Sequence, residues 1–222
     1  MKMAFKSLIL TLILSLTVTA QVSDIEQKMI DQGLLDIQEL DSTLLVHLVY
    51  STEDNFLNYD AYGDLERCYL QPEPATMLVK ASQLLQAEHP DLRLLVYDGV
   101  RPRSVQRRMW DFVGGTDLEQ YVANPERGSI HNFGSAVDLT LARVDGTPLD
   151  MGTVFDHFGE EAHTDEEFTL LEEGRLTAVQ VYNRRLLRRV MEEAGFQPIR
   201  VEWWHFNAFP SKEARARYTI IE

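Results

Sequence analysis

Four side chains with the chemistry of a hydrolytic metal site stand in two short apolar stretches of the sequence. The stretch SIHNFGSAVDLT contains His131 and Asp138, and the stretch VEWWHF contains Glu202 and His205. A buried carboxylate is costly unless a positive group compensates it, and a metal ion is one such group. Two imidazoles and one carboxylate suit Zn²⁺ and leave one coordination position for water. We therefore predict one Zn²⁺ per chain, bound by His131, Asp138 and His205.

Glu202 is the candidate general base. Zinc lowers the pKa of its bound water toward about 7, and a nearby carboxylate can take the proton and pass it to a leaving amine. Residues three apart in a flat strand point to opposite faces. Glu202 and His205 can therefore converge only if the chain turns or bulges between them, and we predict such an irregularity around Trp203 and Trp204. Taken singly, each of these residues is more often structural than functional, whereas the combined spacing is far more specific.

Weaker signals come from two other histidines and from a run of arginines. His157 and His163 lie in an acidic segment, where they could form an adventitious metal site, but solvated loop histidines are the preferred interpretation. The arginines resemble a basic patch, and a solvated face that pairs with the many acidic residues is the preferred interpretation. They are Arg184, Arg185, Arg188 and Arg189.

The elements that must position the site follow from apolar periodicity and from cap signals. Strands are predicted over 44–50, 92–97, 137–142 and 198–206, and residues 54–63 are predicted to form a loop. Helices are predicted over 75–88 after Pro74, over 104–113 with Ser104 as the cap, and up to Ala194 after a capping box at Thr177. Helices and strands mix without a regular βαβ rhythm. We therefore expect an α+β fold with a central, mostly antiparallel sheet and flanking helices.

The first twenty residues have the layout of a cleaved secretory signal. Lys2 and Lys6 precede an apolar run over 8–18, and small residues at 18–20 suit signal peptidase. The run is shorter than the roughly 20 residues that a membrane span needs. We expect export to the periplasm or beyond, without stable membrane insertion after cleavage, and an uncleaved anchor is the alternative. Residues 21–222 would then form a single domain.

Composition restricts the partners. The chain has 35 Asp and Glu against 21 Lys and Arg, for a net charge of −14. This balance argues against nucleic acid and against anionic membrane surfaces. Cys68 is the only cysteine, so no intramolecular disulfide can form.

The motifs resemble those of the zinc D-alanyl-D-alanine dipeptidases, which belong to a larger clan of zinc D,D-peptidases and include vancomycin-resistance dipeptidases among their relatives. They are SxHxxGxAxD at 129–138 and ExWH at 202–205, with further likeness in YSTEDNF at 50–56, YDGVRP at 97–102 and MGTVFD at 151–156. The resemblance implies a hedgehog/D,D-peptidase-like fold and a small dipeptide as substrate. It gives His131, Asp138 and His205 the places of the zinc ligands and Glu202 that of the general base.

The resemblance also implies residues that contact the substrate. Arg101 falls where the family has an arginine that stabilises the tetrahedral intermediate, and Asp98 is expected to support it; without the family, a surface salt bridge would be the simpler interpretation of Arg101. Asp156 aligns with an acidic residue that receives the free amino group of the substrate, because an ammonium in a closed pocket must be neutralised. The remaining matches line or adjoin the substrate cavity: Tyr50, Ser129 and Tyr62, with Tyr59 as the alternative to Tyr62.

Two alternative functions stay open. A D,D-carboxypeptidase or endopeptidase acting on peptidoglycan stem peptides shares the metal site and differs only in substrate reach. A non-catalytic, zinc-stabilised binding module is the second alternative, and the presence of Glu202 and Arg101 argues against it. Export suits recycling or scavenging of wall-derived dipeptide better than intracellular resistance.

Overall fold

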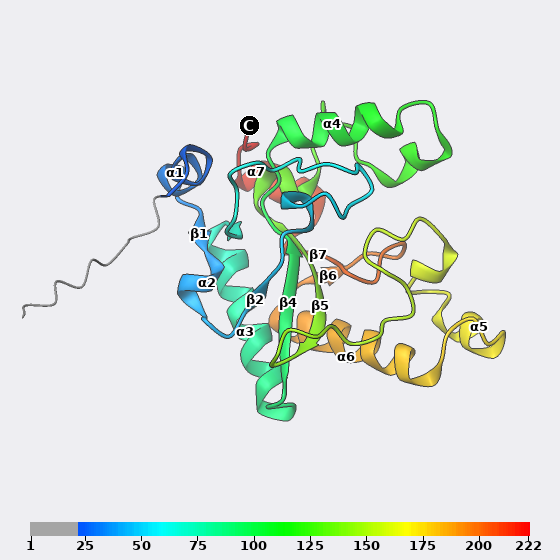
Figure 1. Ribbon diagram of the computed structural model, residues 1–222. Helices are drawn as coiled ribbons and strands as arrows, with labels where there is room; N and C mark the ends of the chain where they lie inside the picture. The colour runs from blue at the N-terminus through cyan, green and yellow to red at the C-terminus, as the bar shows by residue number, and fades with distance from the viewer. Residues whose placement is uncertain (1–21) are drawn as a thin grey trace, which may run out of the picture.

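The computed structural model describes residues 22–222 and shows an α+β fold built on one central sheet (Figure 1). Strands β2 and β4 are parallel, and all other neighbouring strands are antiparallel, which confirms the predicted fold class. The predicted signal, residues 1–20, lies outside the described residues. The order across the sheet is β2 (Leu45–Val46), β4 (Leu92–Asp98), β5 (Ala136–Arg143), β7 (His205–Asn207) and β6 (Gln197–Pro198). A separate ladder joins β1 (Leu35–Asp36) to β3 (Tyr69–Leu70).

Two long helices, α3 (Pro72–Glu88) and α6 (Ala178–Ala194), pack against each other and against the central strands β4 and β5 (Figure 1). Among residues 22–222, no helix combines the length and the apolar character needed to cross a bilayer. The other helices are α1 (Asp24–Asp31), α2 (Ile37–Leu40), α4 (Arg103–Val113), α5 (Glu167–Glu172) and α7 (Ser211–Arg217). Short 3₁₀ turns are η1 (Val49–Ser51), η2 (Asp117–Tyr121), η3 (Ile130–Phe133) and η4 (Glu160–Ala162).

Helix ends follow their local cap chemistry. The predicted capping box of α6 is present, because the Thr177 hydroxyl accepts from the Gln180 N–H and the Gln180 side chain accepts from the Thr177 N–H. Helix α3 begins at Pro72, earlier than predicted, since proline is favoured in the first turn of a helix. Helix α4 begins directly after Pro102, so the prediction that Ser104 caps it was wrong.

Two predicted strands are shorter than expected. Within the segment 44–50, only Leu45–Val46 forms a strand beside β4; His47 adds one backbone hydrogen bond to the Val96 carbonyl, and the chain then turns into η1. The Tyr50 carbonyl accepts from the backbone N–H groups of Ala61 and Tyr62, a tertiary contact that replaces strand pairing. The segment 198–206 is interrupted by a turn at Trp203 and Trp204, and this confirms the predicted irregularity.

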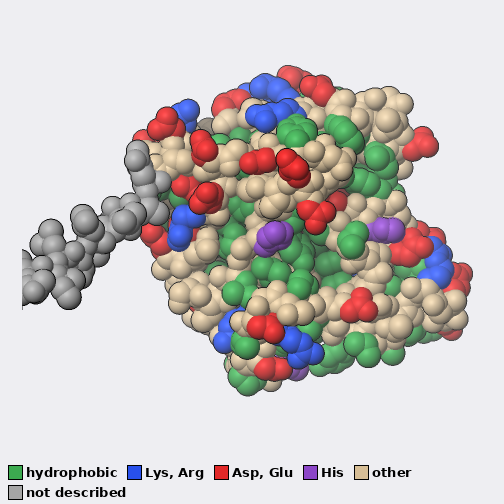
Figure 2. Space-filling model, in the orientation of Figure 1, with side chains coloured by type: hydrophobic (Ala, Val, Ile, Leu, Met, Phe, Trp, Pro, Cys, Tyr) green, Lys and Arg blue, Asp and Glu red, His purple; other side chains and the backbone are tan. Residues whose placement is uncertain are grey.

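The surface carries the acidic excess. Figure 2 shows one face, where acidic side chains spread over the edges while apolar side chains occupy the hollowed centre. The core lies between the sheet and its helices, and β5 is buried along almost its whole length. A buried central strand explains why a carboxylate in it, Asp138, needs a specific electrostatic partner.

Candidate metal and catalytic site

The register of the central sheet brings three site residues into one row. Asp98 of β4 pairs with Asp138 of β5, and Asp138 pairs in turn with His205 of β7. Residues directly opposite in an antiparallel pair share a face of the sheet. The pairing of β4 with β5 skips Tyr97, a β-bulge that brings Asp98 opposite Asp138. His131 joins the row from η3, the turn that immediately precedes β5.

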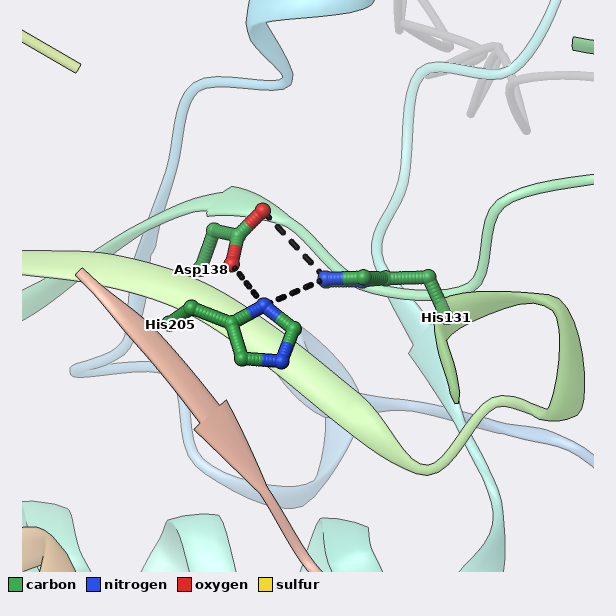
Figure 3. Close-up of side chains that lie close together, drawn as sticks. All are labelled: His131, Asp138 and His205. Carbon is green, nitrogen blue, oxygen red and sulfur yellow. Dashed lines mark hydrogen bonds and ion pairs between the residues drawn. The ribbon is translucent and has the colours of Figure 1, made fainter. Parts of the chain in front are cut away.

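His131, Asp138 and His205 converge on one point (Figure 3), with one potential ligand atom from each lying within 4.8 Å of the others. The His131 Nε2 atom is 3.1 Å from His205 Nδ1 and 3.3 Å from Asp138 Oδ2. The His205 Nδ1 atom is 2.9 Å from Asp138 Oδ1. All three side chains are buried.

The outer hydrogen bonds of the two rings fix which nitrogen faces inward. His131 Nδ1 lies 2.8 Å from the Gly99 carbonyl, which can only accept, so this nitrogen carries the hydrogen and Nε2 of the neutral ring presents its lone pair. His205 Nε2 lies 3.0 Å from Asn207 Oδ1, which assigns the inward lone pair to Nδ1 in the same way. Two lone pairs and a carboxylate then face one another without a donor between them. A divalent cation satisfies this set, and its composition fits Zn²⁺.

Asp138 is held in the charged form that a metal ligand requires. Burial opposes its ionisation, but the positive charge of His131 and His205 when they are protonated lowers the pKa of Asp138 below its ordinary value, and a bound divalent cation would act in the same direction. The carboxylate is therefore ionised throughout the neutral range.

The turn at Trp203 and Trp204 brings Glu202 to the three candidate metal ligands His131, Asp138 and His205, which we call the metal-binding set. Glu202 Oε2 lies 3.8 Å from His205 Nδ1, as the predicted convergence requires. Burial raises the pKa of Glu202 to about 7, although His205 lowers it. A carboxyl group that titrates near neutrality can both accept and return a proton at physiological pH.

Arg101 is anchored by the acid that precedes it by three residues. Its Nε and Nη2 atoms both donate to Asp98 Oδ2, with Nε at 2.9 Å, and its Nη1 donates to Gln106 Oε1 at 3.1 Å. The Tyr62 hydroxyl donates to the other oxygen of Asp98. A guanidinium has five N–H donors, so two remain for a ligand. The expected support of Arg101 by Asp98 is thus present as a direct ion pair.

Asp156 lies on the loop that follows β5. The Tyr50 hydroxyl donates to Asp156 Oδ2 at 2.7 Å. The backbone of Asp156 has φ +58°, a left-handed conformation that is uncommon outside glycine. Burial raises the pKa of Asp156 to about 7, against the lowering effect of the Tyr50 hydrogen bond. A cation that binds beside Asp156 would favour its ionised form and lower this pKa.

One cavity of about 320 Å³ joins these groups. Tyr62 does not line it, contrary to the prediction, because its hydroxyl is engaged behind Arg101 by Asp98. The alternative, Tyr59, is 37% exposed on the surface. The predicted site residues that do line the cavity are Tyr50, Arg101, Ser129, His131, Asp138, Asp156, Glu202 and His205.

Helix α6 holds the loop that carries Asp156, a role that the sequence did not reveal. Gln180 Nε2 and Asn183 Nδ2 donate to the side chain and the carbonyl of Asp150, both at 2.9 Å. Arg184 Nε donates to the Met151 carbonyl at 2.6 Å. Positions i, i+3 and i+4 share one face of a helix, so a single face of α6 clamps the start of the loop.

The prediction that Arg184 lies on a solvated face was therefore wrong. It is buried, with 1% of its surface exposed, and its guanidinium lies 5.8 Å from the centroid of a Trp203 ring. The other three arginines of this helix pair with acidic residues as expected: Arg185 and Arg188 with Glu167, and Arg189 with Glu88. In the described chain, His157 pairs with Glu161, and the only cluster of side chains that could hold a metal ion is His131, Asp138 and His205.

Comparison with known proteins gives consistent matches. The family model described as "D-ala-D-ala dipeptidase" matches residues 30–219. A D-alanyl-D-alanine dipeptidase of Escherichia coli is 34% identical over 173 residues, which cover 78% of this chain and 83% of the relative. One of Enterococcus faecium is 34% identical over 174 residues, with 71% and 82% covered. One of Enterococcus faecalis is 29% identical over 192 residues, with 79% and 91% covered.

Proposed function

Because the chain belongs to the D-alanyl-D-alanine dipeptidase family of metallopeptidases, we propose that it hydrolyses free D-alanyl-D-alanine with one Zn²⁺ held by His131, Asp138 and His205. The observation that carries the proposal is the convergence of these three side chains with Glu202 and Arg101 in one cavity. The donor set fits the metal in type, number and orientation.

The protein's own side chains divide the chemistry between them. Zn²⁺ in this site would supply Lewis-acid chemistry, which polarises a carbonyl and lowers the pKa of water. Glu202 takes a proton from the attacking water and delivers it to the departing amine, a task that suits a pKa of about 7. Arg101 directs its two remaining N–H donors at the carbonyl oxygen as negative charge develops there.

Asp156 and Tyr50 select a substrate with a free amino terminus. An ammonium beside Asp156 stabilises the ionised carboxylate, whose charge is otherwise disfavoured by burial. A substrate with a blocked amine leaves that carboxyl group without a cation, at a cost of about 1–3 kcal/mol. This difference favours a dipeptidase over a carboxypeptidase acting on longer stem peptides.

We also propose that the enzyme works outside the cytoplasm, on dipeptide released from the wall. The support is the secretory layout of residues 1–20 in the sequence. Intact-mass measurement of protein from the periplasmic fraction or the medium checks this proposal. A mass that begins at Gln21 supports it, and a full-length protein confined to the cytoplasm contradicts it.

The decisive assay compares substrates on the zinc-loaded enzyme. We expect turnover of D-Ala-D-Ala that exceeds turnover of L,L-dipeptides and of an N-acetylated tripeptide ending in D-Ala-D-Ala. Equal or faster cleavage of the blocked tripeptide would assign the enzyme to the carboxypeptidases instead. Zinc-dependent folding without turnover of any of these substrates would indicate a binding module.

A further inference from the structure

Arg215 is a cation of the same cavity to which the proposed mechanism gives no role. It lies on α7, and it lines the cavity together with the metal-binding set. Its hydrogen-bond partners in the described chain are all uncharged oxygens, so its charge is not offset by a carboxylate. Arg217, two residues further on, instead pairs with Glu73 and Glu213.

The guanidinium of Arg215 is held in one place although its side chain is exposed. Nε donates to Ser211 Oγ at 3.1 Å, Nη2 donates to the Gly128 carbonyl at 2.7 Å, and Nη1 donates to the Arg127 carbonyl. The group also lies 5.1 Å from the centroid of the Phe133 ring. Three of its five N–H donors are thereby used, and two remain for a ligand in a fixed position.

A zwitterionic substrate needs both an anionic and a cationic partner in the cavity. A free dipeptide carries an ammonium at one end and a carboxylate at the other. Asp138, Asp156 and Glu202 all line the cavity, and Asp138 and Glu202 would balance the charge of the proposed Zn²⁺. Arg101 is already paired with Asp98, which does not line it. The carboxylate of the dipeptide therefore needs a cation in this cavity whose charge has not been offset, and Arg215 is such a group.

The two candidate end-binding groups come from different walls. Asp156 belongs to the loop after β5 and is bonded to Tyr50. Arg215 belongs to α7, which packs on η3, the turn that carries His131. Arg215 donates to the carbonyl of Gly128, the residue that directly precedes Ser129. The metal-binding set lies in the cavity that both walls share.

We propose that Arg215 binds the C-terminal carboxylate of the dipeptide, so that the enzyme recognises both charged ends of its substrate. This inference rests on the proposed dipeptidase function and adds a specificity-determining residue to it. A substrate amidated or extended at its carboxyl end would lose the interaction with Arg215, just as one blocked at its amino end loses Asp156.

The test compares D-Ala-D-Ala with D-Ala-D-alaninamide in the zinc-loaded wild type and in Arg215→Gln, Arg215→Lys and Arg217→Gln. Loss of one charge-assisted contact predicts that Arg215→Gln raises KM for the free dipeptide roughly tenfold, while kcat changes less than about twofold. The amide should be hydrolysed by Arg215→Gln as it is by the wild type. Arg215→Lys should recover part of the affinity, and Arg217→Gln should behave as the wild type.

Three outcomes would overturn the inference. An unchanged KM in Arg215→Gln would show that the carboxylate binds elsewhere. An equal loss on dipeptide and amide would show that Arg215 only holds the segment at 127–128. A wild type that hydrolyses neither compound would refute the proposed function itself, and this failure is distinct because it does not depend on the variant.

Calorimetric titration of D-Ala-D-Ala into Glu202→Gln, with and without Arg215→Gln, gives a binding readout that needs no turnover, and a weaker affinity is expected in the double variant.

Discussion

Asp98 and Arg101 form a buried ion pair at the edge of the cavity, in which two guanidinium nitrogens converge on a single carboxylate oxygen. Asp98 is completely buried, and its other oxygen accepts from Tyr62. The pair fixes the orientation of the guanidinium, so the remaining N–H donors of Arg101 are set before any substrate arrives. Removal of either partner would leave the other as an uncompensated charge in a buried, apolar environment.

Substitution of Asp98 should therefore damage both stability and catalysis. Asp98→Asn leaves the Arg101 charge without its nearest partner, and we expect a loss of about 3 kcal/mol in the free energy of unfolding together with a large fall in kcat. Tyr62→Phe removes one hydrogen bond and leaves the ion pair intact, so its loss should be about 1 kcal/mol. Denaturant unfolding and steady-state kinetics on both variants check this order, and equal effects would contradict it.

Glu202→Gln should separate metal binding from proton transfer. The amide keeps the size of the side chain and cannot accept the proton, so kcat should fall by at least about 10²-fold. The zinc content should stay at one ion per chain, because the donor set is untouched. Turnover and elemental analysis on the same preparation test this prediction. Activity near that of the wild type would exclude Glu202 as the base.

Binding of the substrate should weaken as the pH falls through the pKa of Asp156. Burial places this pKa at about 7, so the carboxylate that attracts an ammonium is present above that value and is lost below it. A bound divalent cation favours the ionised form and moves the transition to lower pH. The affinity for a dipeptide inhibitor with a free amine should therefore decrease on acidification.

Asp156→Asn is the control for this pH dependence. The variant should bind weakly at all pH values and should lose the acidic transition in affinity, while the acidic limb of kcat, which the proposed mechanism assigns to Glu202, should remain. Inhibition constants measured between pH 5 and 9 would show this separation. An unchanged acidic transition in affinity would assign it to another group.

Arg184 should matter for substrate binding more than for stability. Its Nη1 and Nη2 atoms are buried without a hydrogen-bond partner among the described residues, so the charge is costly where it lies. Arg184→Met removes this charge but also releases the Met151 carbonyl, and we expect KM to rise several-fold with a change in unfolding free energy below about 1 kcal/mol. Arg185→Met, on the exposed side of α6, should change neither. A loss of several kcal/mol in Arg184→Met would contradict this prediction.

The sequence revealed the site where residues violate their surroundings. His131, Asp138, Glu202 and His205 are polar groups inside apolar segments, and such violations can be recognised without knowing the fold. The turn at Trp203 and Trp204 followed from the same reasoning, because a straight strand could not have brought Glu202 to His205.

What escaped prediction depends on contacts that are distant in sequence. Nothing local distinguishes Arg184 from Arg185 or Arg188, and only the packing of α6 against the 150–153 loop buries the first of them. The short strand β2 likewise ends at Val46, and the Tyr50 carbonyl, four residues further on, accepts from the distant loop residues Ala61 and Tyr62. Propensity and periodicity do not contain this information.

The central claim is that one zinc ion, held by His131, Asp138 and His205, makes the cavity catalytic. The most direct measurement is a titration of chelator-treated protein with Zn²⁺, in which turnover of D-Ala-D-Ala is followed as metal is added. We predict that turnover rises in proportion to added zinc and saturates at one equivalent, and that His205→Ala at the same zinc concentrations stays inactive. Full activity in the metal-free protein, or zinc-dependent activity that survives in His205→Ala, would contradict the account.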